Sequence, residues 1–164
     1  MRKLDMQREK LTTLWKITKY ADAAAYAAGQ AFDEVEIEGN VALNEGIGLL
    51  LDLLIGAGGT VYSNANAYLG VGDAATAESA SHTGLQAVTN KTYKAMEATF
   101  PSRSGQTLTF KAVFGSSDAN YAWNEFTIVN ASSDTGANLN RKVSAEGTKA
   151  SGQTWTLTAT VTQA

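Results

Sequence analysis

The segment Trp155-Thr156-Leu157-Thr158-Ala159-Thr160-Val161-Thr162 alternates strictly between apolar residues and threonine. Successive side chains of an extended strand point to opposite faces, so one face of this segment is apolar and the other carries hydroxyl groups. A strand of this kind places its apolar face on a core and its polar face outward. The end of the chain is therefore predicted to be a strand of an antiparallel sheet.

Four further segments upstream have the composition or the alternation of strands. They are residues 68–72, 92–100, 107–114 and 122–129. Pro101 ends the second of them, and Phe126 and Ile128 are expected to face inward in the fourth. Spacers rich in serine, glycine and aspartate separate the later segments. This pattern predicts a mainly β protein, an antiparallel sandwich or a small jelly-roll-like barrel.

Two segments before the β region have helical character. Apolar residues recur at helical spacing from Leu43 to Leu54, which predicts one short core helix near residues 43–55. The alanine-rich residues 21–31 are a second candidate, with Asp22 available as the N-cap.

Three glutamates alternate with apolar residues between these two segments. Glu34, Glu36 and Glu38 share one face of a predicted strand, and Val35 and Ile37 share the other. We favour a solvated strand face over a metal or catalytic cluster, because catalytic carboxylates are seldom lined up without partners. A third interpretation is that these glutamates receive the basic arm of a neighbouring chain.

Charge is distributed unevenly along the 164 residues. The net charge is −3, but residues 1–19 hold six basic and two acidic residues, a balance of +4 that leaves −7 for the remainder. We therefore divide the chain into an extended or helical N-terminal arm, residues 1–32, and a β-rich body, residues 33–164. The alternative is a short N-terminal helix packed on its own body. The arm residues predicted to bind a partner are Arg2, Lys3, Arg8, Lys10, Leu11, Trp15, Lys16 and Tyr20.

The composition argues against several classes of chemistry. The chain has no cysteine and a single histidine, His82, so thiolate zinc sites and sites with several histidines are excluded within one chain. Gly70-Val71-Gly72 begins a G-x-G-x-x-A pattern, but no helix is expected after it, so close backbone packing is the better interpretation. We predict no enzyme activity, no cofactor and no metal. The six basic residues near the N-terminus include no arginine cluster, which argues against nucleic acid as a partner. The apolar run from Ile47 to Ile55 is too short to span a membrane.

Trp123 leaves a sugar-binding alternative open. It is surrounded by Asn120, Tyr121, Asn124 and Glu125, a mixture of polar and aromatic residues that suits carbohydrate stacking or a contact between subunits. Trp155, in contrast, lies on the apolar face of its strand and is expected in the core.

Several ordered blocks of the sequence resemble structural proteins of tailed bacteriophages, in particular capsid decoration (auxiliary or cement) proteins. The blocks are residues 67–73, 83–86, 119–126, 130–131, 139–141, 147–149 and 153–158. The resemblance covers roughly residues 40–164 and includes no catalytic motif.

This resemblance implies a non-enzymatic virion protein on the outer surface of the capsid, made in the host cytoplasm. The partners it implies are the major capsid protein and further copies of the chain, as a homotrimer with an arm that reaches neighbouring subunits. A head-fibre or tail component, or a carbohydrate-binding adhesion module, remains the alternative.

Overall fold

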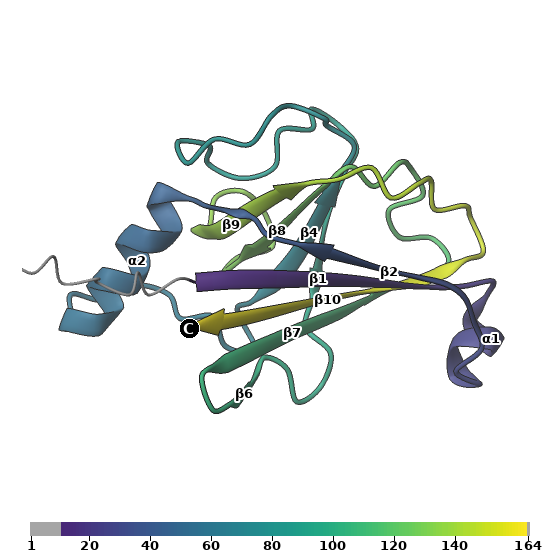
Figure 1. Ribbon diagram of the computed structural model, residues 1–164, viewed down its shortest axis with the longest axis horizontal. Coiled ribbons are helices and arrows are strands. Elements are labelled where there is room, and N and C mark those ends of the chain that lie inside the picture. The colour runs from purple at the N-terminus through teal and green to yellow at the C-terminus, as the bar shows by residue number, and fades with distance from the viewer. Residues whose placement is uncertain (1–10, 164) are drawn as a thin grey trace, which may run out of the picture.

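The computed structural model describes residues 11–163 and consists of two antiparallel sheets packed face to face (Figure 1). The strands of the first sheet are β1 (Leu11–Tyr20), β2 (Ala31–Glu38), β6 (Ser102–Ser104), β7 (Thr107–Phe114) and β10 (Thr154–Gln163). Those of the second sheet are β3 (Val41–Ala42), β4 (Tyr68–Gly72), β5 (Lys91–Ala95), β8 (Glu125–Val129) and β9 (Asn138–Val143). Their orders are β2-β1-β10-β7-β6 and β3-β9-β8-β4-β5. The predicted mainly β sandwich is confirmed.

Strand β10 is the centre of the first sheet, as its alternation predicts. It pairs with β1 along its whole length and with β7 on the other side. Its apolar side chains, from Trp155 to Val161, are buried against the second sheet. Thr158, Thr160 and Thr162 stay partly exposed on the outer face, so the strand is half buried in the expected sense.

Aromatic side chains from both sheets meet in the core. The ring centroid of Trp123 lies 4.8 Å from that of Phe114 and 4.9 Å from that of Trp155, both with edge-on geometry. Phe126 of the second sheet lies 6.0 Å from Trp15 of the first. These contacts join the two sheets at the favourable spacing of aromatic pairs.

The division into an arm and a body is wrong for residues 11–32. β1 lies between β2 and β10 and is hydrogen-bonded to both, so it is an internal strand of the first sheet. The boundary placed after residue 32 falls inside β2. The physical reason is the alternation of β1, which turns Trp15 and Ile17 into the core, where they are completely buried.

The segment after β1 follows the sequence pattern. Helix α1 (Ala23–Ala27) begins at Asp22, whose carboxylate accepts a hydrogen bond from the Ala25 N–H at 2.8 Å. β2 then returns along β1 as an edge strand. Its carboxylates form ion pairs with lysines of the same chain. Lys16 Nζ lies 2.6 Å from Glu34 Oε1, and Lys19 Nζ lies 2.8 Å from Asp33 Oδ2.

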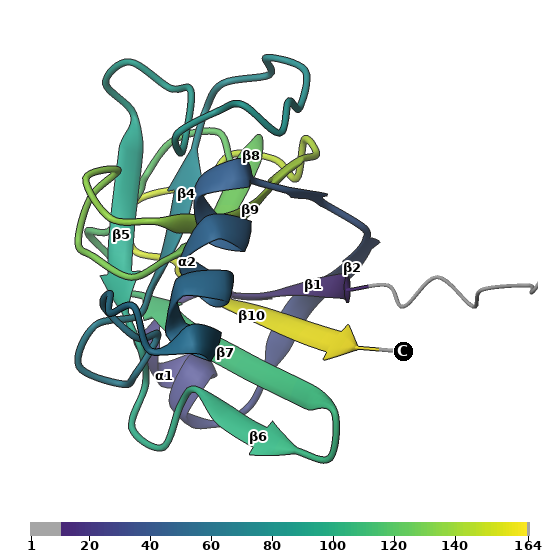
Figure 2. The ribbon, with the colours of Figure 1, turned by 90° about the vertical axis from the view of Figure 1, so that its left-hand side faces the viewer.

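Helix α2 (Asn44–Ile55) has the predicted position but not the predicted core role. It crosses one end of the sandwich (Figure 2). The apolar side chains of its later turns are exposed. Only its beginning is tightly packed, because a Cβ on Gly46 would lie 2.5 Å from the Leu139 Cα. The helix ends at Gly56, which adopts φ 72°, a left-handed conformation that glycine accepts without strain.

Three strand predictions need correction. The strand expected over residues 122–129 begins only at Glu125. The strand expected over residues 92–100 ends at Ala95, and the spacer beginning at Ser102 contains the short edge strand β6. β9 was not predicted, since its sequence Asn-Leu-Asn-Arg-Lys-Val has no apolar alternation. Its polar residues Asn138, Asn140 and Arg141 are nevertheless buried, which requires partners for each of them.

Candidate functional site

The predicted partner-binding residues do not form one surface. Leu11, Trp15, Lys16 and Tyr20 belong to β1, and the first two face the core side while the last two face outward. Trp15 is fully buried and so cannot anchor in a partner, which corrects that prediction. Arg2, Lys3, Arg8 and Lys10 lie outside the described residues, and their role stays a prediction.

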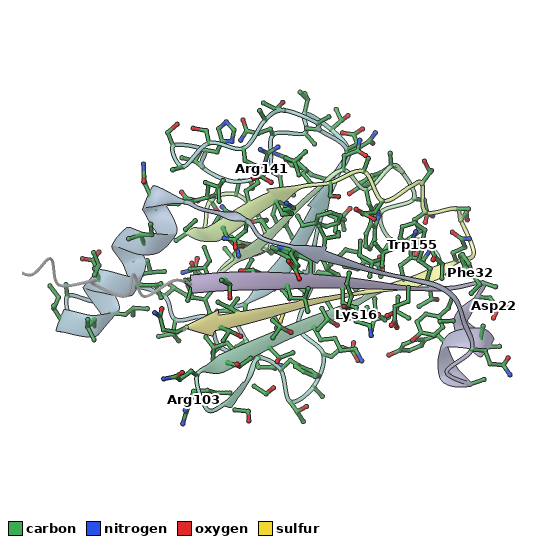
Figure 3. The ribbon with its side chains drawn as sticks, viewed as in Figure 1. Lys16, Asp22, Phe32, Arg103, Arg141 and Trp155 are labelled. Carbon is green, nitrogen blue, oxygen red and sulfur yellow. The ribbon has the colours of Figure 1, made fainter. Side chains whose placement is uncertain are left out.

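Lys16 and Tyr20, the two predicted residues that face outward, both contact other residues of the chain. Lys16 points out from the first sheet (Figure 3) and lies between Glu34 and Glu36, whose nearer carboxylate holds the pKa of Lys16 above its usual value through a hydrogen bond. Tyr20 packs edge-on against Tyr26 of α1 at 5.2 Å between ring centroids. The first contact joins β1 to β2, and the second holds α1 on the end of β1.

An open cavity of about 540 Å³ lies where β1 begins. Its walls include Thr12, Thr13 and Leu14 of β1, Glu38 at the end of β2, Asn40, and Thr160 and Thr162 of β10. Among the described residues, this lining supplies one carboxylate, one amide and four hydroxyls, but no cation or aromatic ring. The cavity suits weak polar contacts and lacks the convergent charged groups typical of a catalytic site.

The strongest polar cluster is a buried ion pair in the second sheet. Arg141 of β9, which lies under the 73–90 loop in Figure 3, donates from Nε to Glu125 Oε2 of β8 at 2.7 Å, and both side chains are fully buried. Arg141 also donates to the Thr76 carbonyl at 3.0 Å and lies 3.3 Å from His82 Nδ1. Glu125 accepts the N–H groups of Gln86 at 2.9 Å and Ala87 at 2.8 Å. The pair therefore fastens the loop of residues 73–90 to the sheet.

Asp134 holds the same loop from a second direction. Its carboxylate accepts the Leu85 N–H at 3.1 Å and pairs with Lys91 Nζ at 2.7 Å. Three consecutive N–H groups, at residues 85–87, thus bind two carboxylates of the chain. Since the Glu125 oxygens are buried and fully used, this cluster has a structural role and offers no free base for catalysis.

A third polar cluster joins the β7–β8 connection to the segment before β10. Asp118 Oδ2 accepts hydrogen bonds from Lys94 Nζ at 2.6 Å and from the Gly115 N–H at 2.8 Å. Lys149, which is completely buried, donates to the Gly115 carbonyl at 2.7 Å and to Asn120 Oδ1 at 2.8 Å. Burial lowers the pKa of Lys149 below its ordinary value.

Acid should weaken the protein partly through Asp118. Burial alone would raise the pKa of Asp118, but the hydrogen bonds from Lys94 and Gly115 and the charge of Lys94 outweigh it, so the net pKa lies below 3.8. A depressed folded-state pKa contributes stability that is present above the unfolded value and is lost as the pH falls through the folded value. Asp118→Asn should therefore reduce the loss of unfolding free energy between about pH 6 and pH 3, measured by urea titration.

Lys94→Met is the matched variant, since it removes the same ion pair from the other side. It should flatten the acid dependence as Asp118→Asn does. Equal pH profiles for both variants and the unsubstituted protein would show that the pair does not contribute.

The sugar-binding interpretation of Trp123 is wrong. Trp123 is fully buried, and its indole N–H donates to the Ala119 carbonyl at 3.0 Å. Tyr121 is partly buried and its hydroxyl donates to Thr92 Oγ1 at 2.8 Å. A stacking platform needs exposed rings, so this pair cannot form one. The polar neighbours in sequence misled here because their polar groups bond within the chain, while the indole faces the core.

The glycines of Gly70-Val71-Gly72 serve close packing, as predicted. A Cβ on Gly70 would lie 2.8 Å from the Thr127 side chain, and one on Gly72 would collide with Glu125. Glycine at these positions lets β8 and the Glu125 carboxylate approach β4.

The most exposed apolar surface of the described residues is on α2. We call it the α2 patch; its members are Ile47, Leu50, Leu51, Leu54 and Ile55. Leu54 and Ile55 are 81% and 77% exposed. Contiguous exposed apolar surfaces are typical of contacts with other molecules. The sequence carried a signal for this exposed surface. A half-buried helix is apolar on one side only, whereas Leu49 and Leu53 make α2 apolar on the side opposite the patch as well.

Residues 11–163 contain no group of three or more histidine, cysteine, aspartate or glutamate side chains placed to hold a metal ion. Within the same residues, none of the helices has the length and apolar character needed to cross a membrane.

Comparison with known proteins identifies no relative of this chain. No family model matches it, and neither the curated proteins nor the solved structures include a match.

Proposed function

We propose that the protein is a non-enzymatic bacteriophage structural protein that binds the exterior of the capsid and stabilises the shell as a decoration protein. Its partners are the major capsid protein and further copies of itself, in a homotrimer. It is made in the host cytoplasm and ends on the capsid surface of the virion.

The observation that carries the proposal of an adhesive protein, which associates with other protein chains, is the α2 patch on a closely packed sandwich. Leu54 and Ile55 are displayed at one end of a sandwich that is held by buried aromatic and ionic contacts. A rigid scaffold with an exposed apolar surface suits protein binding at low entropic cost. The polar clusters of the described residues are used for internal hydrogen bonds, which favours an adhesive role over a catalytic one.

Four of the seven blocks that resemble phage structural proteins fall on the strands of the sandwich or lead into them. Residues 67–73 include β4, residues 139–141 lie in β9, and residues 153–158 begin β10. Residues 119–126 contain the buried Trp123 and lead into β8. The resemblance is therefore one of scaffold, and it supports the class of protein without identifying the surface that binds.

Decoration has a simple physical basis. A ligand that binds the assembled shell, but not the free subunits, stabilises the shell by mass action. Contacts repeated by symmetry add to one another through multivalency. The basic residues Arg2, Lys3, Arg8 and Lys10 carry charge opposite to the acidic remainder of the chain and suit an acidic capsid surface.

Deleting residues 2–10 should weaken capsid binding while leaving the sandwich folded, because β1 begins at Leu11. The measurement is co-sedimentation of purified protein with assembled shells that lack it, at several salt concentrations. The full chain should bind, and its binding should fall with rising salt more steeply than that of the truncated chain. Equal binding and equal salt dependence would contradict a role for the basic segment.

Copy number separates the two virion alternatives. Quantitative mass spectrometry of purified particles should find the chain at a stoichiometry comparable to the major capsid protein. A few copies per particle would favour the head-fibre or tail alternative, and absence from the particle would refute the proposal.

A further inference from the structure

We propose that α2 is the surface through which copies of this chain associate, with the α2 patch of one copy packed against the α2 patch of another. The inference deepens the proposed function and rests on it for the expectation of a homo-oligomer. The observations below select the surface and favour a second copy as its occupant.

The beginning of α2 is held rigidly on the second sheet. Leu43 N–H donates to the Leu139 carbonyl at 3.1 Å, and Glu45 Oε1 accepts the Asn138 N–H at 2.8 Å. Gly46 lies directly on the backbone of Asn138 and Leu139. These contacts fix the direction of the helix across the end of the sandwich, so its later turns are presented in one orientation (Figure 2).

The later turns expose a continuous apolar surface. The five side chains of the α2 patch expose roughly 600 Å² together, about three quarters of the ~800 Å² that each partner buries in a standard interface. A contiguous area of this size exceeds what isolated surface leucines provide and supplies most of what a specific assembly needs.

The composition of α2 resembles a permanent interface between like subunits. From Gly46 to Ile55 the helix has one charged residue, Asp52, and no lysine or arginine. Interfaces with transient partners are about as polar as the remaining surface, whereas interfaces between identical subunits are more apolar. A copy of the chain is also the occupant present from synthesis onward, when the patch must already be kept from water.

A lipid surface fits the helix less well. Helices that lie on membranes carry basic residues on a polar face, and α2 has none. Its 12 residues are also far fewer than the ~20 needed to span a bilayer.

Gly48 points to a second helix as the contacting element. A Cβ on Gly48 would meet no atom of the chain within 4 Å, so the fold itself does not require glycine there. Glycine inside a helix normally weakens it, but it allows the backbone of a neighbouring helix to approach closely. Leu51 and Ile55 follow on the same side of the helix, three and seven positions later. Neighbouring α2 helices can therefore approach closely at Gly48 and pack these side chains between copies.

The test is the oligomeric state of the purified full chain, measured by sedimentation equilibrium over a wide range of concentrations. We expect the unsubstituted protein to associate. Leu51→Glu and Leu54→Glu should each weaken association by at least about 30-fold, because a charge would be buried at the interface. Val88→Glu is the matched control, since Val88 is 91% exposed and lies outside α2, and it should leave association unchanged. Circular dichroism and thermal unfolding should be the same for all variants in their monomeric state.

A second measurement exploits the absence of cysteine from the chain. Single cysteines placed at positions 47, 50, 51, 54 and 55 should include at least one that forms a disulfide between copies rapidly under mild oxidation. Val88→Cys should form it only slowly, at the rate of random collision.

Three results would overturn the inference. They are a monomer at every concentration, an oligomer insensitive to both glutamate substitutions, and cross-linking at Val88→Cys as fast as in the helix. Recovery of a monomer on deletion of residues 2–10, with both glutamate variants still associated, would assign the contact to the basic segment instead. Failure of the capsid proposal is separate: an α2-dependent oligomer that does not bind shells refutes only that proposal, and a monomer that binds them refutes only this inference.

Discussion

Deleting residues 1–20 is expected to abolish folding, although these residues have the composition of a peripheral arm. The deletion removes β1, the strand between β2 and β10, and with it the buried Trp15 and Ile17. Loss of one large core side chain alone costs about 3–5 kcal/mol, a large part of the 5–15 kcal/mol that stabilises a typical domain. The truncated chain should lack cooperative unfolding, measured by urea titration followed by circular dichroism and by tryptophan fluorescence.

The matched control is the deletion of residues 2–10, which ends just before β1. This chain should unfold cooperatively with nearly the stability of the full protein. A cooperative transition in the chain without residues 1–20 would mean that the sandwich closes without its second strand, and the assignment of β1 to the core would then be wrong.

Glu125→Gln is expected to have the second largest effect. The substitution leaves the guanidinium of Arg141 fully buried without its counter-charge, and it replaces an acceptor of the loop N–H groups of Gln86 and Ala87 by an amide. Breaking a buried ion pair by removing one partner costs about 3–5 kcal/mol. The free energy of unfolding should fall by that amount, and amide hydrogen exchange should rise first in the loop of residues 73–90.

Two variants test this explanation. Glu125→Gln combined with Arg141→Met removes the unpaired charge and should recover part of the lost stability, since a buried pair can be replaced by neutral groups at low cost. Glu34→Gln makes the same chemical change in the solvent-exposed pair with Lys16 and should cost far less. Equal losses for Glu34→Gln and Glu125→Gln would show that burial of the ion pair does not decide its importance.

The strands with clear alternation could be predicted from the sequence because their pattern is local. β7 and β10 place apolar residues at every second position, and these are buried except for Leu108 near the start of β7. The start of α1 at Asp22 and the end of α2 at Gly56 were predictable for the same reason, because caps depend on a few adjacent residues.

β1 illustrates where local pattern fails. Its outward positions include Leu14 and its inward positions include Lys19, so apolar and charged residues do not separate cleanly between the faces. Lys19 is buried all the same, because Asp33 and the Glu146 carbonyl accept its hydrogen bonds and its Nζ lies 4.8 Å from the Trp155 ring centroid. Those three groups come from distant parts of the chain, and none is visible from the residues around Lys19.

The predictions for β9 and α2 failed in opposite directions for the same reason. The polar Asn140 and Arg141 are buried because Thr13, Glu125 and the 73–90 loop provide partners. The apolar Leu54 is exposed because only the first turn of α2 reaches the second sheet. Hydrophobicity measures the cost of contact with water, and the positions of other segments decide whether that cost is avoided.

Periodicity, caps and composition are properties of neighbouring residues, and they were enough to establish a cysteine-free β protein with its helices and most of its strands. Pairing between β1 and β10 joins residues as far apart as Leu11 and Gln163, and such contacts form only when the whole chain is folded. Only the long-range arrangement shows that part of the predicted arm is an internal strand and that most of the predicted core helix is exposed. Both changes follow from one cause: a side chain is buried by its neighbours in space, and local sequence specifies only its neighbours along the chain.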